Sequence, residues 1–200
     1  MPSEATALEL TTSKPPTPDL RHRLRAATAS AHARLDKRFG GLDLSLLPDY
    51  RQFLEASAAA LLPLESALIE AGVARLFPDW PMRSRRHAIL DDLADVDGEF
   101  TPLRIPKPLD FGGVLGAMYV LEGSRLGAAL LVKTVERSND PQIVSATAYL
   151  RHGTGQHLWR SFLAALENHA MALDDDESAA EGARLAFAMF ERAAAETIRP

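Results

Sequence analysis

The sequence of 200 residues contains no cysteine. This absence excludes disulfide bonds, cysteine-ligated zinc, iron–sulfur clusters and catalysis by a thiol. A basic surplus is lacking too, since 22 Lys and Arg stand against 27 Asp and Glu, for a formal net charge of −5. Nucleic-acid binders usually carry the opposite excess, so we expect no nucleic-acid partner.

Long apolar runs and the usual catalytic motifs are also missing. No stretch approaches the roughly 20 apolar residues of a membrane-spanning helix, so no membrane partner is expected. The first residues carry acids and lack the apolar segment of a signal peptide, which predicts a cytoplasmic location. The sequence has no Glu-x-x-His pair, no His-Glu-x-x-His, no phosphate-binding Walker loop and no Gly-x-Ser-x-Gly. These gaps argue against di-iron, zinc-protease, nucleotide-hydrolysing and serine-hydrolase sites.

What is abundant is alanine, which occurs 33 times and favours helix over strand. Residues 1–18 are rich in Thr, Ser and Pro and are predicted to be a disordered lead-in. Asp19 can cap a helix, and one all-α domain is predicted over 19–200. Residues 143–150 are the nearest candidate for a strand, but they lie among helical patterns. The expected helices span 19–38, 48–71, 82–95, 109–136, 139–151, 155–171 and 174–198.

The first predicted helix places a histidine and an arginine on one face. Arg25 and His32 are seven residues apart, which is about 20° short of two full turns and about 10 Å along the axis. That offset suits a flat metallo-porphyrin, with iron on the imidazole and an acidic edge near the arginine. Thr28 lies between them on the same face, and Asp36 follows His32 by one turn. An ordinary hydrogen-bonded histidine is the alternative interpretation.

The helix predicted at 109–136 contains glycines that a helix does not need. Gly123 and Gly127 are one turn apart, and Ser124 and Ala128 extend the small surface. Each glycine costs about 1 kcal/mol relative to alanine in a helix. The strip therefore indicates that a ligand or another part of the chain approaches the helix backbone closely at these positions. Close helix–helix packing, or Gly123 as a helix C-cap, would explain it equally well.

A basic run lies at residues 83–87, with Arg83, Arg85 and Arg86 next to His87. It has no interleaved aromatic residues. We interpret it as the solvated face of a helix, with a docking patch for a protein partner as the alternative.

Four segments in order resemble the haem oxygenase family. Residues 24–36 (LRAATASAHARLD) and 116–131 (GAMYVLEGSRLGAALL) are similar to its proximal and distal helices. Residues 155–162 (GQHLWRSF) and 182–197 (GARLAFAMFERAAAET) are similar to its bacterial branch. The resemblance spans about 20–198 and implies a single-domain helical bundle with haem held between a proximal and a distal helix.

The resemblance also implies roles for individual residues. His32 is then the proximal iron ligand, and Gly123, Ser124 and Gly127 form the catalytic distal strip. The residues expected to contact haem are Arg25, Thr28, Tyr119, Ala128, Arg160 and Phe187. Two positions depart from relatives that place a propionate there, namely Phe190 in place of Tyr and Gln156 in place of a basic residue.

The implied activity is O2-dependent opening of haem to biliverdin, with release of iron and CO. Haem is both substrate and cofactor. Because no flavin or nicotinamide motif is present, electrons are expected from a separate reductase or ferredoxin. The distal strip carries no histidine or acid, so small residues and bound water are expected to supply the proton. No helix shows a heptad seam, and a monomer is expected.

Three alternatives remain open on the sequence. A haem carrier or sensor of the same fold would also use His32 and would differ in turnover alone. A thiaminase-type enzyme of the same fold relies on cysteine or acidic pocket residues, and this chain has no cysteine. A helical interaction protein without ligand would leave Gly123 and Gly127 to helix packing.

Overall fold

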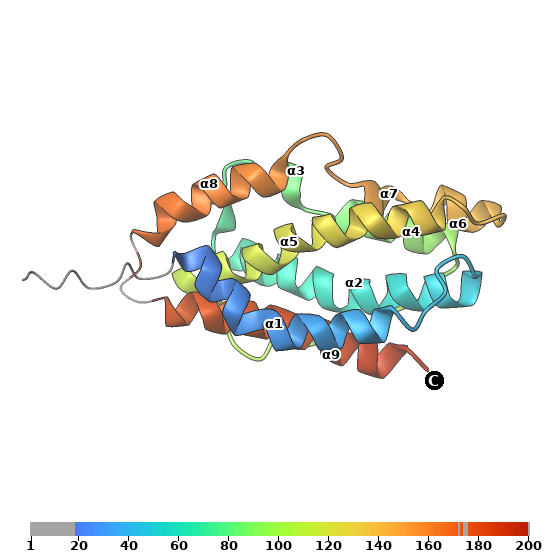
Figure 1. Ribbon diagram of the computed structural model, residues 1–200, viewed down its shortest axis with the longest axis horizontal. Helices are drawn as coiled ribbons and strands as arrows, with labels where there is room; N and C mark the ends of the chain where they lie inside the picture. The colour runs from blue at the N-terminus through green and yellow to red at the C-terminus, as the bar shows by residue number, and fades with distance from the viewer. Residues whose placement is uncertain (1–18, 172, 174–175, 200) are drawn as a thin grey trace, which may run out of the picture.

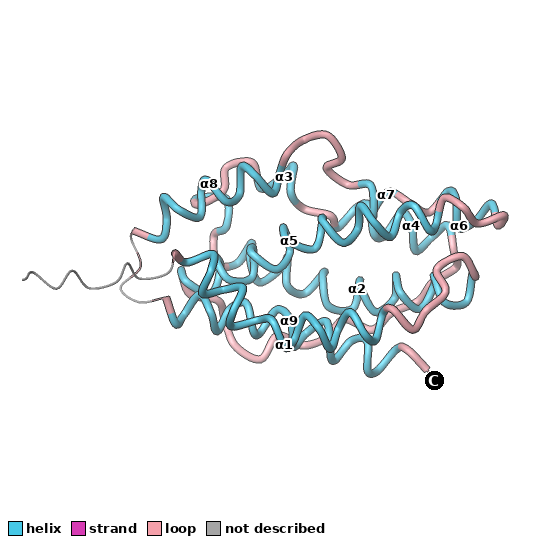
Figure 2. The backbone as a smooth tube through the Cα atoms, viewed as in Figure 1, coloured by secondary structure: helices cyan, strands magenta, loops and turns pink. Residues whose placement is uncertain are grey.

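The computed structural model describes residues 19–171, 173 and 176–199. These residues form helices joined by turns and loops, and no strand occurs among them (Figure 2). The predicted all-α class is confirmed. The disordered lead-in predicted at 1–18 lies outside the described residues.

Four long helices build the bundle, and shorter ones close it. The long helices are α1 (Leu20–Phe39), α2 (Leu47–Glu70), α5 (Phe111–Val135) and α9 (Glu177–Thr197). The shorter ones are α3 (Trp80–Arg83), α4 (Arg86–Asp95), α6 (Pro141–Ser145), α7 (Ala148–Arg151) and α8 (Leu158–Ala170), with a 3-10 turn at Val73–Arg75.

Two predicted helices are each broken into two. The segment 82–95 leaves the helix at Ser84, whose backbone is extended, so that α3 ends before α4 begins. The segment 139–151 breaks at Ala146 and Thr147, between α6 and α7. The strand candidate 143–150 therefore lies in α6, α7 and the turn between them.

Asp19 begins the first helix as predicted. Its Oδ1 accepts a hydrogen bond from the backbone N–H of His22 at 2.7 Å. Asp110 caps α5 in the same way, since it accepts from the N–H of Gly113 at 2.7 Å. Such caps satisfy N–H groups that have no partner within the helix.

Helices α1 and α9 run side by side along one edge of the bundle, with α2 and α5 above them in this view, and both α2 and α5 pack against α9 (Figure 1). The closest packing joins α5 to α9, where backbones meet at glycines. A Cβ added at Gly116 would lie 1.9 Å from the carbonyl oxygen of Ala179, and one at Gly182 would lie 2.4 Å from that of Gly113. No larger residue fits at these two points.

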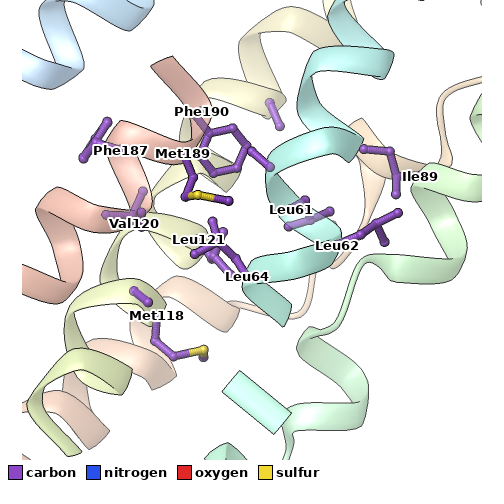
Figure 3. Close-up of a cluster of buried hydrophobic side chains, with 14 of the residues drawn as sticks. Leu61, Leu62, Leu64, Ile89, Met118, Val120, Leu121, Phe187, Met189 and Phe190 are labelled. Carbon is purple, nitrogen blue, oxygen red and sulfur yellow. The ribbon is translucent and has the colours of Figure 1, made fainter. Parts of the chain in front are cut away.

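The core fills the space between α2, α5 and α9 (Figure 3). Leu61 and Leu64 of α2 face Met118 of α5 and Phe190 of α9, and all four are buried. Burial of such side chains is the main favourable term in folding. This core fixes the distance between α5 and the α1–α9 pair, which sets the width of the site described below.

Helices α2 and α5 are long and apolar enough, by length and composition, to cross a membrane. The sequence predicts no membrane-spanning segment, because no stretch approaches the roughly 20 apolar residues that one needs. In the most apolar 18-residue window of each helix, 72% of the α2 residues and 50% of the α5 residues are buried inside the bundle. A core position accounts for this composition, since a helix that is apolar on most sides is a buried one.

Candidate functional site

A cavity of about 610 Å³ lies between α1, α5 and α9. Residues of α2, α7 and α8 and of the α3–α4 turn complete its lining. The volume falls within the range of about 300–1,000 Å³ that small-molecule sites occupy. The cavity opens to solvent along the α1 side, where many of its lining residues are exposed.

Nine of the ten residues predicted for the site line this cavity. They are Arg25, Thr28, His32, Tyr119, Gly123, Ser124, Gly127, Ala128 and Phe187. The tenth, Arg160, is exposed on α8 and is not part of the lining. Of the two departures from the family pattern, Phe190 lines the cavity and Gln156 does not.

His32 is held by a carboxylate one turn further along α1. Its Nδ1 lies 2.7 Å from Oδ2 of Asp36, and its ring packs against Phe187 with centroids 5.8 Å apart. The His32 side chain is 63% exposed, so it is not an ordinary core histidine. A carboxylate on Nδ1 favours the tautomer with the proton there, which leaves the lone pair of Nε2 free to bind a metal.

The glycine strip of α5 faces the cavity and not another helix. Nothing lies within 4 Å of a Cβ built on Gly127. A Cβ on Gly123 would meet only the ring of Trp159, at 3.7 Å. Since α5 continues to Val135, Gly123 is not a C-cap, and both alternatives that the sequence left open are excluded at these two positions.

The N-terminal end of α1 gives the cavity a positively charged end. Arg25 lies there with Arg21, one turn earlier, and both are exposed. Burial raises the pKa of the Tyr119 phenol, and the charges of Arg21 and Arg25 partly offset that rise. The phenol therefore stays protonated near neutral pH and can donate a hydrogen bond beside two cations.

The two hydroxyl groups predicted for the site are bound to their own helices. Oγ of Ser124 donates to the carbonyl oxygen of Leu121 at 2.8 Å. Oγ1 of the buried Thr28 donates to that of Leu24 at 2.7 Å. Each hydroxyl can still accept a hydrogen bond, so neither is arranged as a nucleophile.

Several cavity residues were missed from the sequence. Arg21 could have been found, because it continues the helical face of Arg25 and His32 by one more turn. Trp159 could not, since it comes from α8 and reaches the cavity by packing on Tyr119, with ring centroids 5.7 Å apart. Ser57 of α2 and Arg85 of the α3–α4 turn are distant in the sequence from all the predicted residues.

The prediction for the basic run 83–87 was wrong. Arg83 is only 3% exposed and forms ion pairs with Asp79 and with Glu122, at 2.7 and 2.9 Å. Arg125 pairs with the other oxygen of Glu122 at 2.9 Å. One buried carboxylate on α5 thus joins two arginines directly behind the glycine strip.

The other two arginines of the run are also turned inward. Arg85 is 2% exposed. Arg86 is half-buried and donates to Oγ of Ser66 at 2.7 Å. The break at Ser84 is the reason, because residues 83–86 do not share one helix and so have no common outer face.

Together these groups suit one kind of ligand. Among the described residues no cluster of three or more His, Asp or Glu side chains could hold a bare metal ion. A single imidazole, an opposite wall with a strip of glycine backbone and two arginines at one end fit a flat macrocycle that brings its own metal and carries carboxylates.

Comparisons with known proteins agree with this geometry. Residues 74–196 match the model of the protein family described as "Heme oxygenase". The chain is 29% identical to heme oxygenase PigA of Pseudomonas aeruginosa over 175 residues, which cover 84% of this chain and 87% of that protein. It is 29% identical to a heme oxygenase of Xanthomonas campestris over 153 residues, covering 76% and 92%.

The fold has a counterpart among solved structures. A heme oxygenase of Neisseria meningitidis, determined with NO and CO bound, superposes with a TM-score of 0.73. The superposition covers 89% of this chain and 91% of that one, at 24% sequence identity. At this identity the likeness concerns the arrangement of the helices.

Proposed function

Because the chain belongs to the haem oxygenase family, we propose that it opens haem with O2 to biliverdin, releasing iron and CO. Haem is its substrate and supplies both the iron at which O2 is activated and the ring that is cleaved. No observation supports a different reaction in this cavity as strongly.

One observation supports the proposal above all others. The cavity has a histidine with its Nδ1 held by Asp36 on one wall and open glycine backbone on the other. An imidazole is a common ligand of haem iron. The unfilled space over Gly127 leaves the opposite side of the ring accessible to a small molecule.

His32 and Asp36 set the proximal side of the reaction. The carboxylate of Asp36 orients the ring and raises the basicity of Nε2 through the proton on Nδ1. Both residues lie on one continuous helix, so their relative position is maintained without contributions from elsewhere in the fold.

The distal strip contributes to the reaction by its lack of large side chains. Gly123 and Gly127 leave backbone and space in place of side chains, and Ser124 presents only an acceptor to the cavity. Water bound along this strip can deliver a proton without a strong acid nearby. Small residues also leave O2 free to approach the edge of the ring.

Arg21, Arg25 and Tyr119 are proposed to hold the propionates of haem. Arginine donates two parallel hydrogen bonds to a carboxylate, and the protonated Tyr119 can add a third. They lie at one end of the cavity only, so they would fix the rotation of haem in its plane. This rotation decides which bridge carbon faces the oxygen.

The reaction also needs electrons and O2 from outside the chain. We propose a separate reductase or ferredoxin as the donor, because the sequence carries no flavin or nicotinamide motif. A monomeric state and a cytoplasmic location remain predictions.

A haem titration followed by one turnover tests the proposal. Hemin is added to the purified chain, the Soret band is recorded, and ascorbate or a ferredoxin–reductase pair is then supplied in air. We expect a one-to-one complex that converts to biliverdin, identified by its spectrum and by chromatography. Haem that is bound and never opened would favour a carrier or sensor, and a chain that binds no haem would refute the proposal.

A further inference from the structure

Arg85 is a buried cation without a carboxylate partner. Its side chain is 2% exposed, and its Nη2 donates to the carbonyl oxygen of Leu121 at 3.0 Å. Within the described part of the chain its Nε and Nη1 have no hydrogen-bond partner, and no carboxylate lies within ion-pair distance of its guanidinium group. A buried charge in this condition is costly and calls for a ligand.

The carboxylates nearest in the fold are each bound by other donors. Glu65 accepts from the hydroxyl of Ser84 and from the backbone N–H of Arg85, at 2.6 and 2.7 Å. Asp92 accepts from two backbone N–H groups at the start of α7, both at 2.8 Å.

Glu122 is held by the ion pairs with Arg83 and Arg125 described above. None of the three acids forms an ion pair with the guanidinium of Arg85, which is therefore left without a direct carboxylate partner among the described residues.

The free donors of Arg85 point to the cavity. Every fully buried side-chain nitrogen and oxygen of the described residues has a hydrogen-bond partner. Nε and Nη1 of Arg85 have none, so they keep access to open space, and Arg85 lines the cavity. The ring of Tyr149 lies under the guanidinium, 5.0 Å from Cζ to the ring centroid, and restricts its movement.

A second free donor lines the same cavity. Ser57 of α2 is 2% exposed, and no hydrogen bond is formed by its hydroxyl in the described residues. A guanidinium and a hydroxyl are both donors from which an anion accepts hydrogen bonds.

We propose that Arg85 and Ser57 form a binding site for a small monovalent anion, such as a halide or nitrate, in the inner wall of the cavity. A buried guanidinium with free donors and no direct ion pair favours a small ligand of negative charge. The site is separate from Arg21 and Arg25, which are exposed on α1, whereas Arg85 is buried behind α5. It does not depend on the proposed function, since the donors are present in the chain itself.

Bromide is a suitable probe because its anomalous scattering identifies its position. Crystals of the full chain, with and without haem, are soaked in sodium bromide. We expect an anomalous peak within hydrogen-bond distance of the Arg85 guanidinium and the Ser57 hydroxyl. Bromide found only at Arg21 and Arg25, or nowhere in the cavity, overturns the proposal.

Thermal unfolding of the haem-free chain gives the solution test. Sodium bromide is titrated against sodium gluconate at constant ionic strength, so that only the identity of the anion changes. Wild type should show a saturable rise in Tm with bromide, because a ligand of the folded state stabilises it. The variant Arg85→Met should bind bromide at least about tenfold more weakly, the loss expected for a hydrogen bond to a charged group.

Two further variants keep the result interpretable. Arg86→Met removes the neighbouring arginine, which donates to Leu62 and Ser66 and does not line the cavity, and should leave the bromide response unchanged. Ser57→Ala retains the charge and should weaken bromide binding a few-fold, which covers the case in which Arg85→Met does not fold. An equal bromide response in wild type, Arg85→Met and Ser57→Ala contradicts the site.

Discussion

At the scale of single residues, the six histidines of the chain show how surroundings decide chemistry. His169 lies with Nε2 3.0 Å from the carbonyl oxygen of Leu76, and Nδ1 of His152 lies 3.1 Å from Arg125. Burial and the charge of Arg125 lower the pKa of His152 to about 4, so it stays neutral. Only His32 combines a carboxylate on Nδ1 with a place in the cavity wall.

Replacement of His32 by Ala is therefore expected to abolish turnover and to change the ferric haem spectrum, because the iron loses its protein ligand. The Soret band of the titrated variant measures this. His22→Ala, on the same helix and exposed outside the cavity, is the matched control and should leave both unchanged. An unaltered spectrum in His32→Ala would rule out its role as ligand.

At the scale of elements, α5 uses glycine for two different purposes. Gly116 allows contact with the backbone of α9, where a Cβ would meet the carbonyl oxygen of Ala179 at 1.9 Å. Gly127, eleven residues later, has open space in front of it. The sequence pattern alone did not distinguish the two, because both glycines interrupt a continuous helical pattern.

Gly127→Leu is expected to lower the yield of biliverdin more than the affinity for haem, because a side chain would fill the space over the ring. The Tm should not fall, since leucine favours helix over glycine and a Cβ at this position has no neighbour within 4 Å. Haem titration, product chromatography and thermal unfolding measure these three quantities. Equal losses of affinity and yield would argue against a steric role.

Gly116→Ala tests the other use of glycine on the same helix. Its Cβ would meet the backbone of α9, which cannot give way as a flexible side chain does, so the free energy of unfolding should fall by about 3 kcal/mol, the upper part of the usual cost of overpacking. Chemical denaturation measures the loss, and an unchanged stability would contradict the close contact between α5 and α9.

At the scale of the whole molecule, buried charges join elements that are far apart in the sequence. Glu122 of α5 binds Arg83 of α3, and Arg83 donates to the carbonyl oxygen of Leu158 and to Oγ of Ser161 in α8. Helices α3, α5 and α8 are thereby held together behind the glycine strip. The position of Trp159 at Gly123 follows from this connection.

Glu122→Gln should lower the free energy of unfolding by about 3–5 kcal/mol, because it leaves two buried arginines without their carboxylate. Chemical denaturation measures the change. Glu181→Gln removes an exposed partner of Lys107 and should have little effect, since exposed ion pairs contribute little. Comparable losses of unfolding free energy in the two variants would show that the buried ion pairs of Glu122 stabilise the fold no more than the exposed pair does.

The stability of the molecule should also depend on pH through Asp92. Burial raises the pKa of this carboxyl to about 6, whereas it is about 4 in an unfolded chain. Between about pH 4 and 6 the folded chain holds a proton that the unfolded chain has lost. The free energy of unfolding therefore falls as the pH rises, by at most about 1.4 kcal/mol per pH unit.

Asp92→Asn isolates this contribution. The stability of wild type relative to the variant should decrease from about pH 4 to 6 and then stay constant. The lowered pKa of His152 acts in the opposite direction in the same window, but it is common to both proteins and cancels in the difference. A difference that is independent of pH would contradict the raised pKa.

The local sequence pattern predicts the all-α class, the start of the first helix at Asp19 and the face that carries Arg25 and His32. These depend on interactions within about two turns of one helix, which helical periodicity reports directly. The sequence also indicated the strip of small residues at Gly123 and Gly127, but not whether that strip faces a cavity or another helix. The position of Asp36 beside His32 follows from the same local geometry.

The tertiary structure alone decided the rest. Arg83 and Arg85 lie inward because the helix breaks at Ser84. Arg83 also binds Glu122, 39 residues further along the chain, and no local sequence pattern reports such a contact. The tertiary structure also left Arg160 outside the cavity and brought Trp159 and Ser57 to its walls. Contacts between distant segments depend on how the helices pack, and packing is specified by the whole core and not by the residues on either side of a position.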